Sequence, residues 1–293
     1  MTLPKVSVHI ISYNQKDYIR EAVESALAQD YPNLEIVIAD DASTDGTADI
    51  LREYQSAQPH RVTAILGECN LGLSGNGNRA LNACTGEFIA FMGGDDILLP
   101  GKIAAQVAWL SEREERVLCA HQVEVFYDDR SRAPHPLSKR LRSGRGAEEI
   151  IRHQPFGAVS VMVRANRIPP HGYRTELPMV SDNMMWVEVL REDGVFGCVP
   201  GILSRYRRHD ANVSRDPFRY LSEVERHFEI LEREFPMFRH AIAYAKRRRL
   251  HYDVGTTLLR MNRRHDARRE FLQVVQREPL FVKAWIRLMQ SYL

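Results

Sequence analysis

The run from Leu34 to Ala39 is apolar, β-branched and nearly continuous, and two adjacent carboxylates, Asp40 and Asp41, follow it. Such a run is typical of a strand that is buried on both faces of a parallel sheet. Open α/β sheets bind their ligands beyond the carboxyl ends of the strands. The two carboxylates are therefore predicted to lie at a binding edge. The alternative is that they only cap the helix expected near Thr47.

A second strand-like run, from Glu87 to Met92, ends in Gly93-Gly94-Asp95-Asp96. Adjacent carboxylates oppose each other's ionisation, so a doublet is stable when a cation or an array of donors faces it. Carboxylate oxygens suit Mg²⁺ or Mn²⁺, whose shell is often completed by substrate phosphates. Glycines before the doublet would let a diphosphate approach the backbone closely. A simple surface turn is the alternative for this segment.

The amino-terminal segment Lys5 to Ile11 predicts a first strand, and a helix with apolar residues at helical spacing follows from Ile19 to Leu27. Strand, helix and strand then follow in order, as in a βαβ unit. The turn after the first strand lacks the Gly-x-Gly-x-x-Gly pattern of dinucleotide-binding proteins, and the chain has no Gly-x-x-x-x-Gly-Lys-Ser/Thr motif. The sequence thus predicts an α/β nucleotide site without either glycine signature.

With these motifs the sequence resembles the family 2 glycosyltransferases, which have the GT-A fold and invert the sugar carbon. The resemblance covers nearly three quarters of the chain, to about Ser214. Its motifs are Val6-Ser-Val-His-Ile-Ile-Ser-Tyr-Asn14, Gln29-Asp-Tyr-Pro-Asn-Leu-Glu-Ile-Val-Ile-Ala-Asp-Asp41, Ser43-Thr-Asp-Gly-Thr47, Gly86-Glu-Phe-Ile-Ala90 and Asp95-Asp96. It implies a Rossmann-like, mostly parallel sheet flanked by helices.

The resemblance implies a set of nucleotide contacts. Asp41 would accept from N3 of a uracil-type base, Tyr13 would stack on the ring, and Ile11 would touch the base through its backbone. Asn78 would line the nucleotide pocket, and Asp95 would contact the ribose or the metal shell.

The metal site and the general base are implied in the same way. Asp96 would ligate Mn²⁺ or Mg²⁺, with His209 contacting the metal or the diphosphate, and Asp182 would be the general base. The chain departs from the family twice. Gly94 stands where the first acidic residue of an Asp-x-Asp-Asp motif is usual, and Ser181 replaces the glutamate of a Glu-Asp motif.

Asp182 precedes a helical stretch, so an N-cap is the alternative to catalysis for this residue. A transferase needs a base because the acceptor hydroxyl loses a proton as it attacks the anomeric carbon, and such a base contributes about 10² to 10⁴ in rate. The helix N-terminus is expected to stabilise the ionised form of Asp182 and to weaken its basicity.

Two strands are expected near Val195 to Val199 and Ile202 to Tyr206, before the element Tyr206-Arg-Arg-His-Asp-Ala-Asn-Val-Ser214. Related transferases carry a similar element that closes over the donor. By that resemblance Arg207 or Arg208 would balance phosphate charge. A solvated basic loop is the alternative, and we favour it for the two arginines.

Three regions follow from these patterns: residues 1–100 as the nucleotide-sugar half of a GT-A domain, 101–215 as the acceptor half, and 216–293 as a helical region. In the last, Gly255, Ala267, Phe271 and Pro279 fall at tetratricopeptide offsets, and Trp285 lies 34 residues after His251. Small residues are needed where paired helices cross, with an aromatic residue filling the groove. A plain three-helix tail is the alternative.

Composition fits a globular enzyme, with 44% hydrophobic and 27% charged residues in a chain of 293. Four separated cysteines, Cys69, Cys84, Cys119 and Cys198, indicate reduced thiols and not a zinc site. Since no apolar run approaches the roughly 20 residues of a membrane span, and no signal peptide is evident, a cytoplasmic location is expected.

The helical region is rich in arginine although the net charge of the chain is only +2. Basic residues near an anionic bilayer contribute about 1 kcal/mol each, so peripheral attachment at the inner membrane face is one hypothesis, and solvated helix faces are the alternative we favour. Binding of nucleic acid is not expected, because the basic cluster lacks interleaved aromatic residues. The same helices are a candidate surface for a homo-oligomer or another protein.

The predicted function is a metal-dependent inverting transfer of a sugar from a nucleotide-diphosphate sugar, with a UDP or dTDP donor favoured. The acceptor would be a hydroxyl of a glycan or a lipid-linked molecule. Two alternatives stay open: a nucleotidyltransferase, and a catalytically weakened GT-A-like binding module whose helical tail docks a partner.

Overall fold

The computed structural model describes residues 3–128, 132–138, 140–154, 156–191, 193–209 and 217–293. The chain divides into two compact units, Met1–Ala147 with Pro155–Asp210, and Glu148–Gln154 with Ala211–Leu293. Residue 216, where the helical region was expected to begin, lies outside the described residues, as do Asn212 and Ser214. Residues 148–154, which the prediction assigned to the acceptor half, belong to the second unit.

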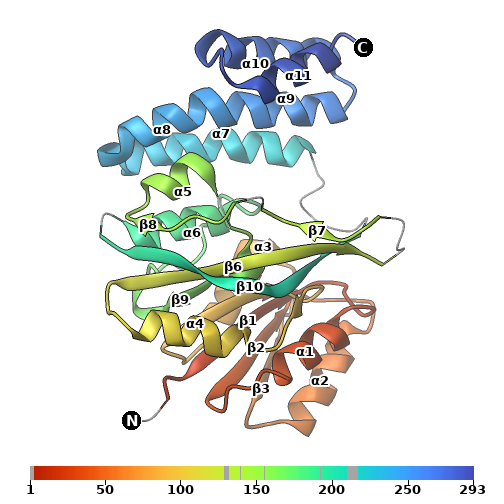
Figure 1. Cartoon of the computed structure of the whole chain (residues 1–293). Helices are drawn as coiled ribbons and strands as arrows, with labels where there is room; N and C mark the ends of the chain where they lie inside the picture. The colour runs from red at the N-terminus through yellow and green to blue at the C-terminus, as the bar shows by residue number, and fades with distance from the viewer. Residues whose placement is uncertain (1–2, 129–131, 139, 155, 192, 210–216) are drawn as a thin grey trace. The chain divides into compact units, whose positions relative to one another are not determined.

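The first unit is built on one sheet (Figure 1). Its strands are β1 (Val6–Ser12), β2 (Leu34–Asp40), β3 (Val62–Leu66), β4 (Phe88–Gly93), β5 (Ile97–Leu98), β6 (Arg116–Tyr127), β7 (His135–Pro136), β8 (Gly144–Arg145), β9 (Met162–Arg164) and β10 (Val195–Arg208). They lie in the order β3-β2-β1-β4-β9-β6-β10-β5, with β7 paired to β6 and β8 to β10.

Strand direction decides where the functional residues lie. β1 is parallel to β2 and β4, and β2 is parallel to β3. β9 is antiparallel to both β4 and β6, so β6 runs in the direction of β4, and β10 is parallel to β6. The predicted mostly parallel sheet is therefore confirmed. The carboxyl ends of β1, β2, β3, β4, β6 and β10 all reach the same edge, which we call the carboxyl edge.

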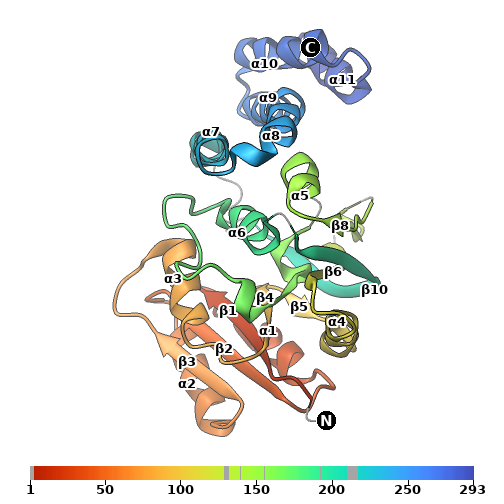
Figure 2. The same ribbon diagram turned by 90° about the vertical axis from the view of Figure 1, so that its left-hand side faces the viewer.

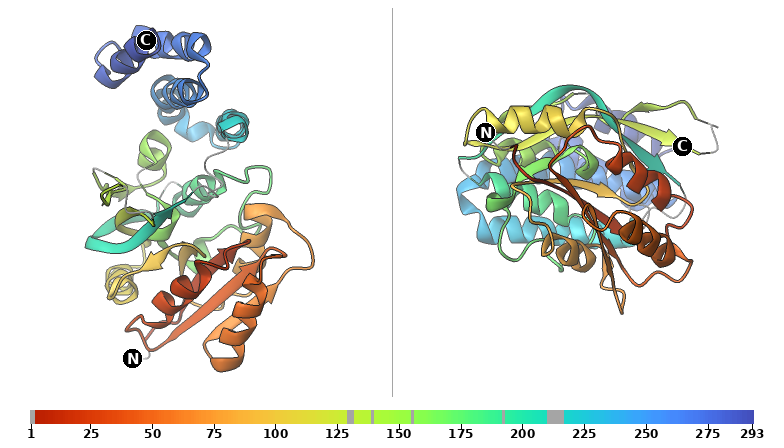
Figure 3. Two further views of the ribbon diagram at one scale, coloured as in Figure 1. Left: turned by 90° about the vertical axis from the view of Figure 1, so that its right-hand side faces the viewer. Right: turned by 90° about the horizontal axis from the view of Figure 1, so that it is seen from below.

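Helices cover both faces of this sheet (Figures 2 and 3). Their bounds are α1 (Ile19–Leu27), α2 (Thr47–Ala57), α3 (Gly72–Leu81), α4 (Lys102–Ser111) and α6 (Ser181–Leu190), with short 3₁₀ turns η1 (Ala158–Ser160) and η2 (Ala165–Arg167). Side chains alternate along a strand. In β1, Val8 and Ile10 belong to the core cluster that includes α1, α2 and α4. The opposite face bears Phe91 of β4, whose ring packs on Trp186 of α6.

The strands predicted at β1, β2 and β4 are confirmed, whereas two other expectations need correction. The two strands expected between residues 195 and 206 form the single strand β10, whose pairing with β6 is irregular between Cys198 and Ser204. Gly201 has a φ of +98° there, which glycine adopts without strain. The run Ala158-Val-Ser-Val-Met-Val163 also predicts a strand, but it begins as the 3₁₀ turn η1 and becomes extended only at β9.

Lys102 is an unusual member of this unit because its side chain is completely buried. Its Nζ donates to Oε1 of Gln106 at 2.7 Å. Burial lowers the pKa of Lys102 to about 7, and the charge of neighbouring Cys119 acts in the opposite direction. The unfolded chain therefore binds more protons than the folded chain between about pH 7 and 10.5, so this lysine makes stability rise with pH in that window.

We expect Lys102→Met to stabilise the protein most at or below pH 7, with a gain that fades as the pH approaches 10.5. The relative slope is at most about 1.4 kcal/mol per pH unit. Denaturant unfolding of both proteins between pH 6 and 10 measures it, and parallel stability curves would contradict the assignment.

The second unit is helical. Its elements are α5 (Glu148–His153), α7 (Pro217–Glu234), η4 (Pro236–Phe238), α8 (Arg239–Ala245), the π-helical turn η5 (Lys246–Leu250), α9 (His251–Arg260), α10 (Arg264–Arg277) and α11 (Val282–Gln290). A Cβ on Gly255 of α9 would lie 2.8 Å from the Phe271 ring of α10, so the two helices approach closely there. A larger residue than glycine would clash with the ring at this position. Trp285 is 44% exposed, and its Nε1 donates to the Pro279 carbonyl at 2.9 Å.

Within the part of the chain that the structure describes, no helix combines the length and apolar character of a membrane span. Exposed large apolar side chains gather near the end of the helical unit, at Leu280, Val282, Trp285, Ile286, Met289, Tyr292 and Leu293.

Candidate active site

The carboxyl edge collects the acidic positions that the sequence singled out. Asp40 ends β2 and Asp41 follows it, while Asp95 and Asp96 follow β4 at the same edge. Helix α6 ends at Leu190, shortly before β10 starts at the opposite edge, so its first turn, with Asp182, points back towards the carboxyl edge. Separate segments of the chain thus bring their carboxylates to one side of the first unit.

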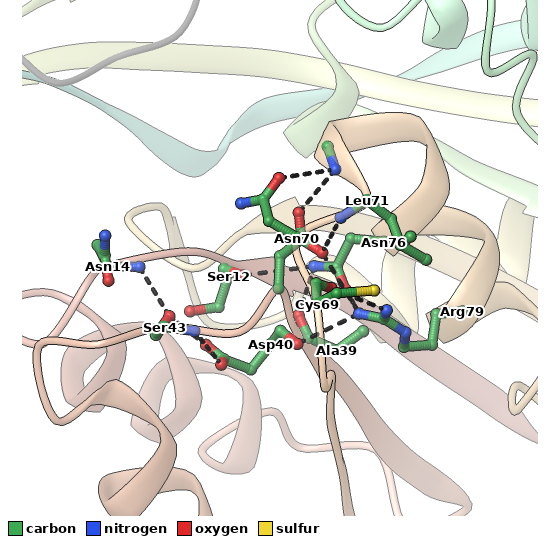
Figure 4. Close-up of polar contacts among 12 residues, drawn as sticks. Ser12, Asn14, Ala39, Asp40, Ser43, Cys69, Asn70, Leu71, Asn76 and Arg79 are labelled. Atoms are coloured by element: carbon green, nitrogen blue, oxygen red, sulfur yellow. Dashed lines mark hydrogen bonds and ion pairs between the residues drawn. The ribbon is translucent and has the colours of Figure 1, made fainter.

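The two carboxylates of the first doublet have different hydrogen-bond partners, and Figure 4 shows those of Asp40. Asp40 is buried and caps the following turn, because its carboxylate accepts the Ser43 N–H at 2.9 Å and the Ser43 hydroxyl at 2.5 Å. Ser43 also accepts the Asn14 N–H at 2.8 Å, which braces the loop after β1 against the loop after β2. Asp40 thus stabilises the turn after β2 and does not cap helix α2, since the Thr47 N–H is accepted by Asp45.

Asp41 points in another direction, towards the N-terminus of α3. Its two carboxylate oxygens accept the N–H groups of Leu71 and Gly72, each at 2.8 Å. The guanidinium of Arg79 lies 3.4 Å from Oδ1. Asp41 thus holds the start of α3 in place, in addition to any base contact that the resemblance implies.

Arg79 and Asn76, which the sequence analysis passed over, reinforce this corner (Figure 4). Arg79 donates to Oδ1 of Asn76 at 3.0 Å, and Asn76 donates to the Ala39 carbonyl at 2.8 Å. They fall three residues apart on α3, so they share a helix face, and this spacing was the available signal.

Two residues expected to contact the base lie at the carboxyl end of β1, with Ile11 inside the strand and Tyr13 directly after it. The carbonyl of Ile11 accepts the Gly94 N–H at 2.9 Å, which ties the end of β1 to the Gly-Gly-Asp-Asp turn. Tyr13 is 50% exposed, so its ring is accessible for stacking. The structure brings both residues to the carboxyl edge, and their contacts with a nucleotide stay predictions.

Asn78 joins α3 to the loop before α6. Its amide donates to the Tyr173 carbonyl at 2.9 Å and accepts the Tyr173 N–H at 2.6 Å. A Cβ on Gly77 would lie 2.7 Å from the Tyr173 ring, so only glycine leaves room for the ring at this distance. Tyr173 also contacts the ring of His9, and its role was not visible in the sequence.

Asp182 lies in the first turn of α6, where its carboxylate accepts the Asn183 N–H at 2.7 Å. Burial raises the pKa of Asp182 to about 6, although hydrogen bonds from the backbone act in the opposite direction. The expectation that the helix N-terminus would weaken the basicity of Asp182 is therefore wrong, because desolvation raises its pKa by more than the backbone hydrogen bonds lower it. Burial, and then the charge of Asp182, raise the pKa of Tyr173 well above its usual value, so these two groups are neighbours.

The second doublet is held by backbone and histidine donors. Asp96 accepts the Arg207 N–H at 3.2 Å and the Gly93 N–H at 3.3 Å. The Nε2 atom of His209 lies 2.9 Å from the carboxylate of Asp95, and its ring stacks on Tyr18. His209 therefore belongs to the acidic turn.

The donor set at this turn fits a hard cation. Burial, and then the charge of neighbouring Asp95, raise the pKa of Asp96 well above its usual range, so a bound cation would favour the ionised doublet. Among the described residues, no three His, Cys, Asp or Glu side chains form a ready metal cage. Mg²⁺ sites commonly use only one or two carboxylates and take the remaining ligands from phosphates and water.

The structure contradicts the interpretation that Arg207 belongs to a solvated basic loop. It lies in strand β10, and it is only 5% exposed. His209 follows the end of this strand two residues later, and both side chains contact Asp95, as an alternation of faces would predict. That spacing was the sequence signal that could have identified it.

A separate hollow of about 600 Å³ lies at the opposite edge of the sheet. The ion pairs Arg164–Glu87 and Arg167–Asp193 line it, at 3.3 and 2.7 Å. Since charges of opposite sign pair there, and the predicted site residues lie elsewhere, it is not the candidate active site.

Comparison with known proteins identifies the family. Residues 7–168 match the model described as "Glycosyl transferase family 2". The chain belongs to this family. A relative named putative glycosyltransferase EpsE, from Bacillus subtilis, is 31% identical over 64% of the chain and 68% of its own length. The putative teichuronic acid biosynthesis glycosyltransferase TuaG of the same organism is 28% identical over 74% of the chain and 84% of its own length.

An uncharacterized protein of Mycobacterium tuberculosis is 34% identical over 70% of the chain, which spans only 59% of that relative. Among solved structures, S. aureus TarS 1-349 in complex with UDP-GlcNAc superposes with a TM-score of 0.65 at 17% identity. The match covers 98% of this family 2 chain and 89% of TarS 1-349. It confirms the GT-A type fold.

Proposed function

We propose that the protein is a metal-dependent, inverting glycosyltransferase that uses a nucleotide-diphosphate sugar. The observation that carries this proposal is Asp182, a carboxylate whose pKa burial raises to about 6 and which lies in the helix turn on the side of the sheet that bears the Asp95–Asp96 doublet. The proposed reaction requires two carboxylate sites, a general base for the acceptor hydroxyl and an acidic turn for the cation at the diphosphate. Membership of the family supports the assignment.

In the proposed reaction, Asp182 accepts the proton of the acceptor hydroxyl while that oxygen bonds to the anomeric carbon. The bond from this carbon to the diphosphate oxygen breaks on the opposite face, and its electron pair leaves with the diphosphate. Asp96, with Asp95 and His209 beside it, would hold Mn²⁺ or Mg²⁺ at the diphosphate. A bound cation acts as a Lewis acid towards the leaving group.

For the donor we propose a UDP-sugar, with dTDP as the second choice. TarS has been solved with UDP and with UDP-GlcNAc. A further relative, named an Escherichia coli UDP-Glc:alpha-D-GlcNAc-diphosphoundecaprenol beta-1,3-glucosyltransferase, is 41% identical over 36% of the chain. The names of this enzyme and of TuaG support a bacterial surface glycan or its lipid-linked precursor as acceptor.

Incubation with a panel of UDP- and dTDP-sugars and Mn²⁺ tests the proposal. Release of nucleoside diphosphate, by transfer or by slow hydrolysis, is the expected result. A parallel incubation with UTP or dTTP and a sugar 1-phosphate tests the nucleotidyltransferase alternative, because pyrophosphate release from the triphosphate would identify that activity. Binding of the nucleotide sugar without any turnover, across the panel and with glycan acceptors added, would favour the binding module.

A further inference from the structure

All three side-chain nitrogens of Arg207 donate hydrogen bonds to other parts of the protein. Its Nε donates to the carbonyl of Asp95 at 2.9 Å, and its two Nη atoms donate to the carboxylates of Asp128 and Glu21. These partners come from the turn after β4, the end of β6 and helix α1. Every nitrogen of the guanidinium thus already faces an acceptor of the protein.

Two aromatic rings enclose the same group. The guanidinium carbon lies 5.0 Å from the ring centre of Tyr18 and 4.6 Å from that of Phe126. Such contacts are stronger when the cation is removed from water, and Arg207 is nearly completely buried. Movement of this side chain towards a ligand would break several interactions at once.

The backbone of Arg207 completes the arrangement, because its N–H donates to Oδ1 of Asp96. One residue therefore holds both members of the doublet, Asp95 through its carbonyl and Asp96 through its carboxylate.

We propose that Arg207 is a positioning residue that fixes the Asp95–Asp96 turn for cation and diphosphate binding, and that it does not itself bind the diphosphate. The proposal rests on the proposed function for its ligand. Its structural part, the hold on the turn, stands on contacts within the protein. Arginine suits this position because its planar fork reaches three acceptors in fixed directions, which the single ammonium of lysine does not reproduce.

The variants Arg207→Met and Arg207→Lys test this role, with Arg205→Met as the matched control. Arg205 lies on the same strand, pairs with Glu124 at 2.8 Å and stacks on the same Phe126 ring at 4.3 Å. Like Arg207, it therefore combines an ion pair to a carboxylate with a contact to the Phe126 ring. Its backbone pairs with Ile97 of β5, a contact that the methionine variant keeps, and its side-chain contacts with Glu124 and Phe126 do not reach Asp95 or Asp96.

Two measurements separate positioning from general stability. Amide hydrogen exchange of residues 93–98 should become at least tenfold faster in Arg207→Met and stay at the wild-type rate in Arg205→Met. The increase in UDP affinity produced by Mn²⁺ should fall at least tenfold in Arg207→Met, with an intermediate loss in Arg207→Lys, while UDP affinity measured in EDTA stays unchanged.

Wild-type exchange of residues 93–98 in Arg207→Met would overturn the proposal. An equal loss of UDP affinity with and without Mn²⁺ would do the same, since that result indicates a direct contact with the nucleotide or a damaged fold. If the wild-type protein binds no UDP under either condition, the proposed function fails, and the exchange measurement alone still decides whether Arg207 holds the turn.

Discussion

Asp182→Asn is expected to lower kcat by about 10² to 10⁴, the usual contribution of a positioned general base. Asparagine keeps the size of the side chain and an oxygen that can accept the Asn183 N–H, but it cannot take the proton of the acceptor hydroxyl. Donor binding should therefore persist. Turnover and UDP affinity, measured on the same preparation, check both statements, and unchanged turnover would refute the role of Asp182.

The same variant should be more stable than the wild type above pH 6. The folded-state pKa of Asp182, about 6, exceeds its ordinary value of 3.8, so ionisation of this group at higher pH works against folding. Its removal should add roughly 1 to 3 kcal/mol to the free energy of unfolding. A loss of activity combined with a gain in stability separates catalysis from misfolding.

The pH dependence of the wild type follows from the same group. Because the ionised carboxylate is the base, kcat/KM should fall about tenfold per pH unit below pH 6. An exposed carboxylate at the opposite edge, Asp193, offers a control, since Asp193→Asn should leave this profile unchanged.

Asp96→Asn is expected to lower kcat/KM by about 10² to 10³, because charge stabilisation by a metal is worth several kcal/mol. The loss should appear together with loss of the Mn²⁺-dependent part of UDP affinity. The matched control is Asp40→Asn, which alters an equally buried carboxylate at the same edge that caps Ser43. This control should lower thermal stability and leave the response to Mn²⁺ intact. Binding of UDP that is independent of metal in both variants and wild type would remove the metal assignment.

The sequence predicted the features that depend on local pattern. The continuous apolar runs of β1, β2 and β4 identified three parallel strands, and the acidic doublets behind two of them identified the carboxyl edge. Asp182 was found through the resemblance and the helix that follows it. In each case the information lies within a few neighbouring residues.

The features that the sequence did not reveal depend on partners far along the chain. Strand β6 was missed because His121, Gln122 and Glu124 interrupt its apolar pattern, and its direction is set by pairing with β9 and β10. The pKa of Asp182 was expected in the wrong direction, since burial by distant segments cannot be read from a helix N-terminus. The buried site of Arg207 likewise needs contacts from Glu21 and Asp128.

The arrangement of strands has an evolutionary consequence. In the first unit the proposed chemical groups stand on turns, at strand ends and on the first turn of a helix, while the strand interiors form the packed and hydrogen-bonded core. Loops at an edge can change length and composition at small cost to a rigid core. Relatives can therefore acquire new sugars and new acceptors by exchanging these connections, and selection can explore substrates without having to rebuild the scaffold.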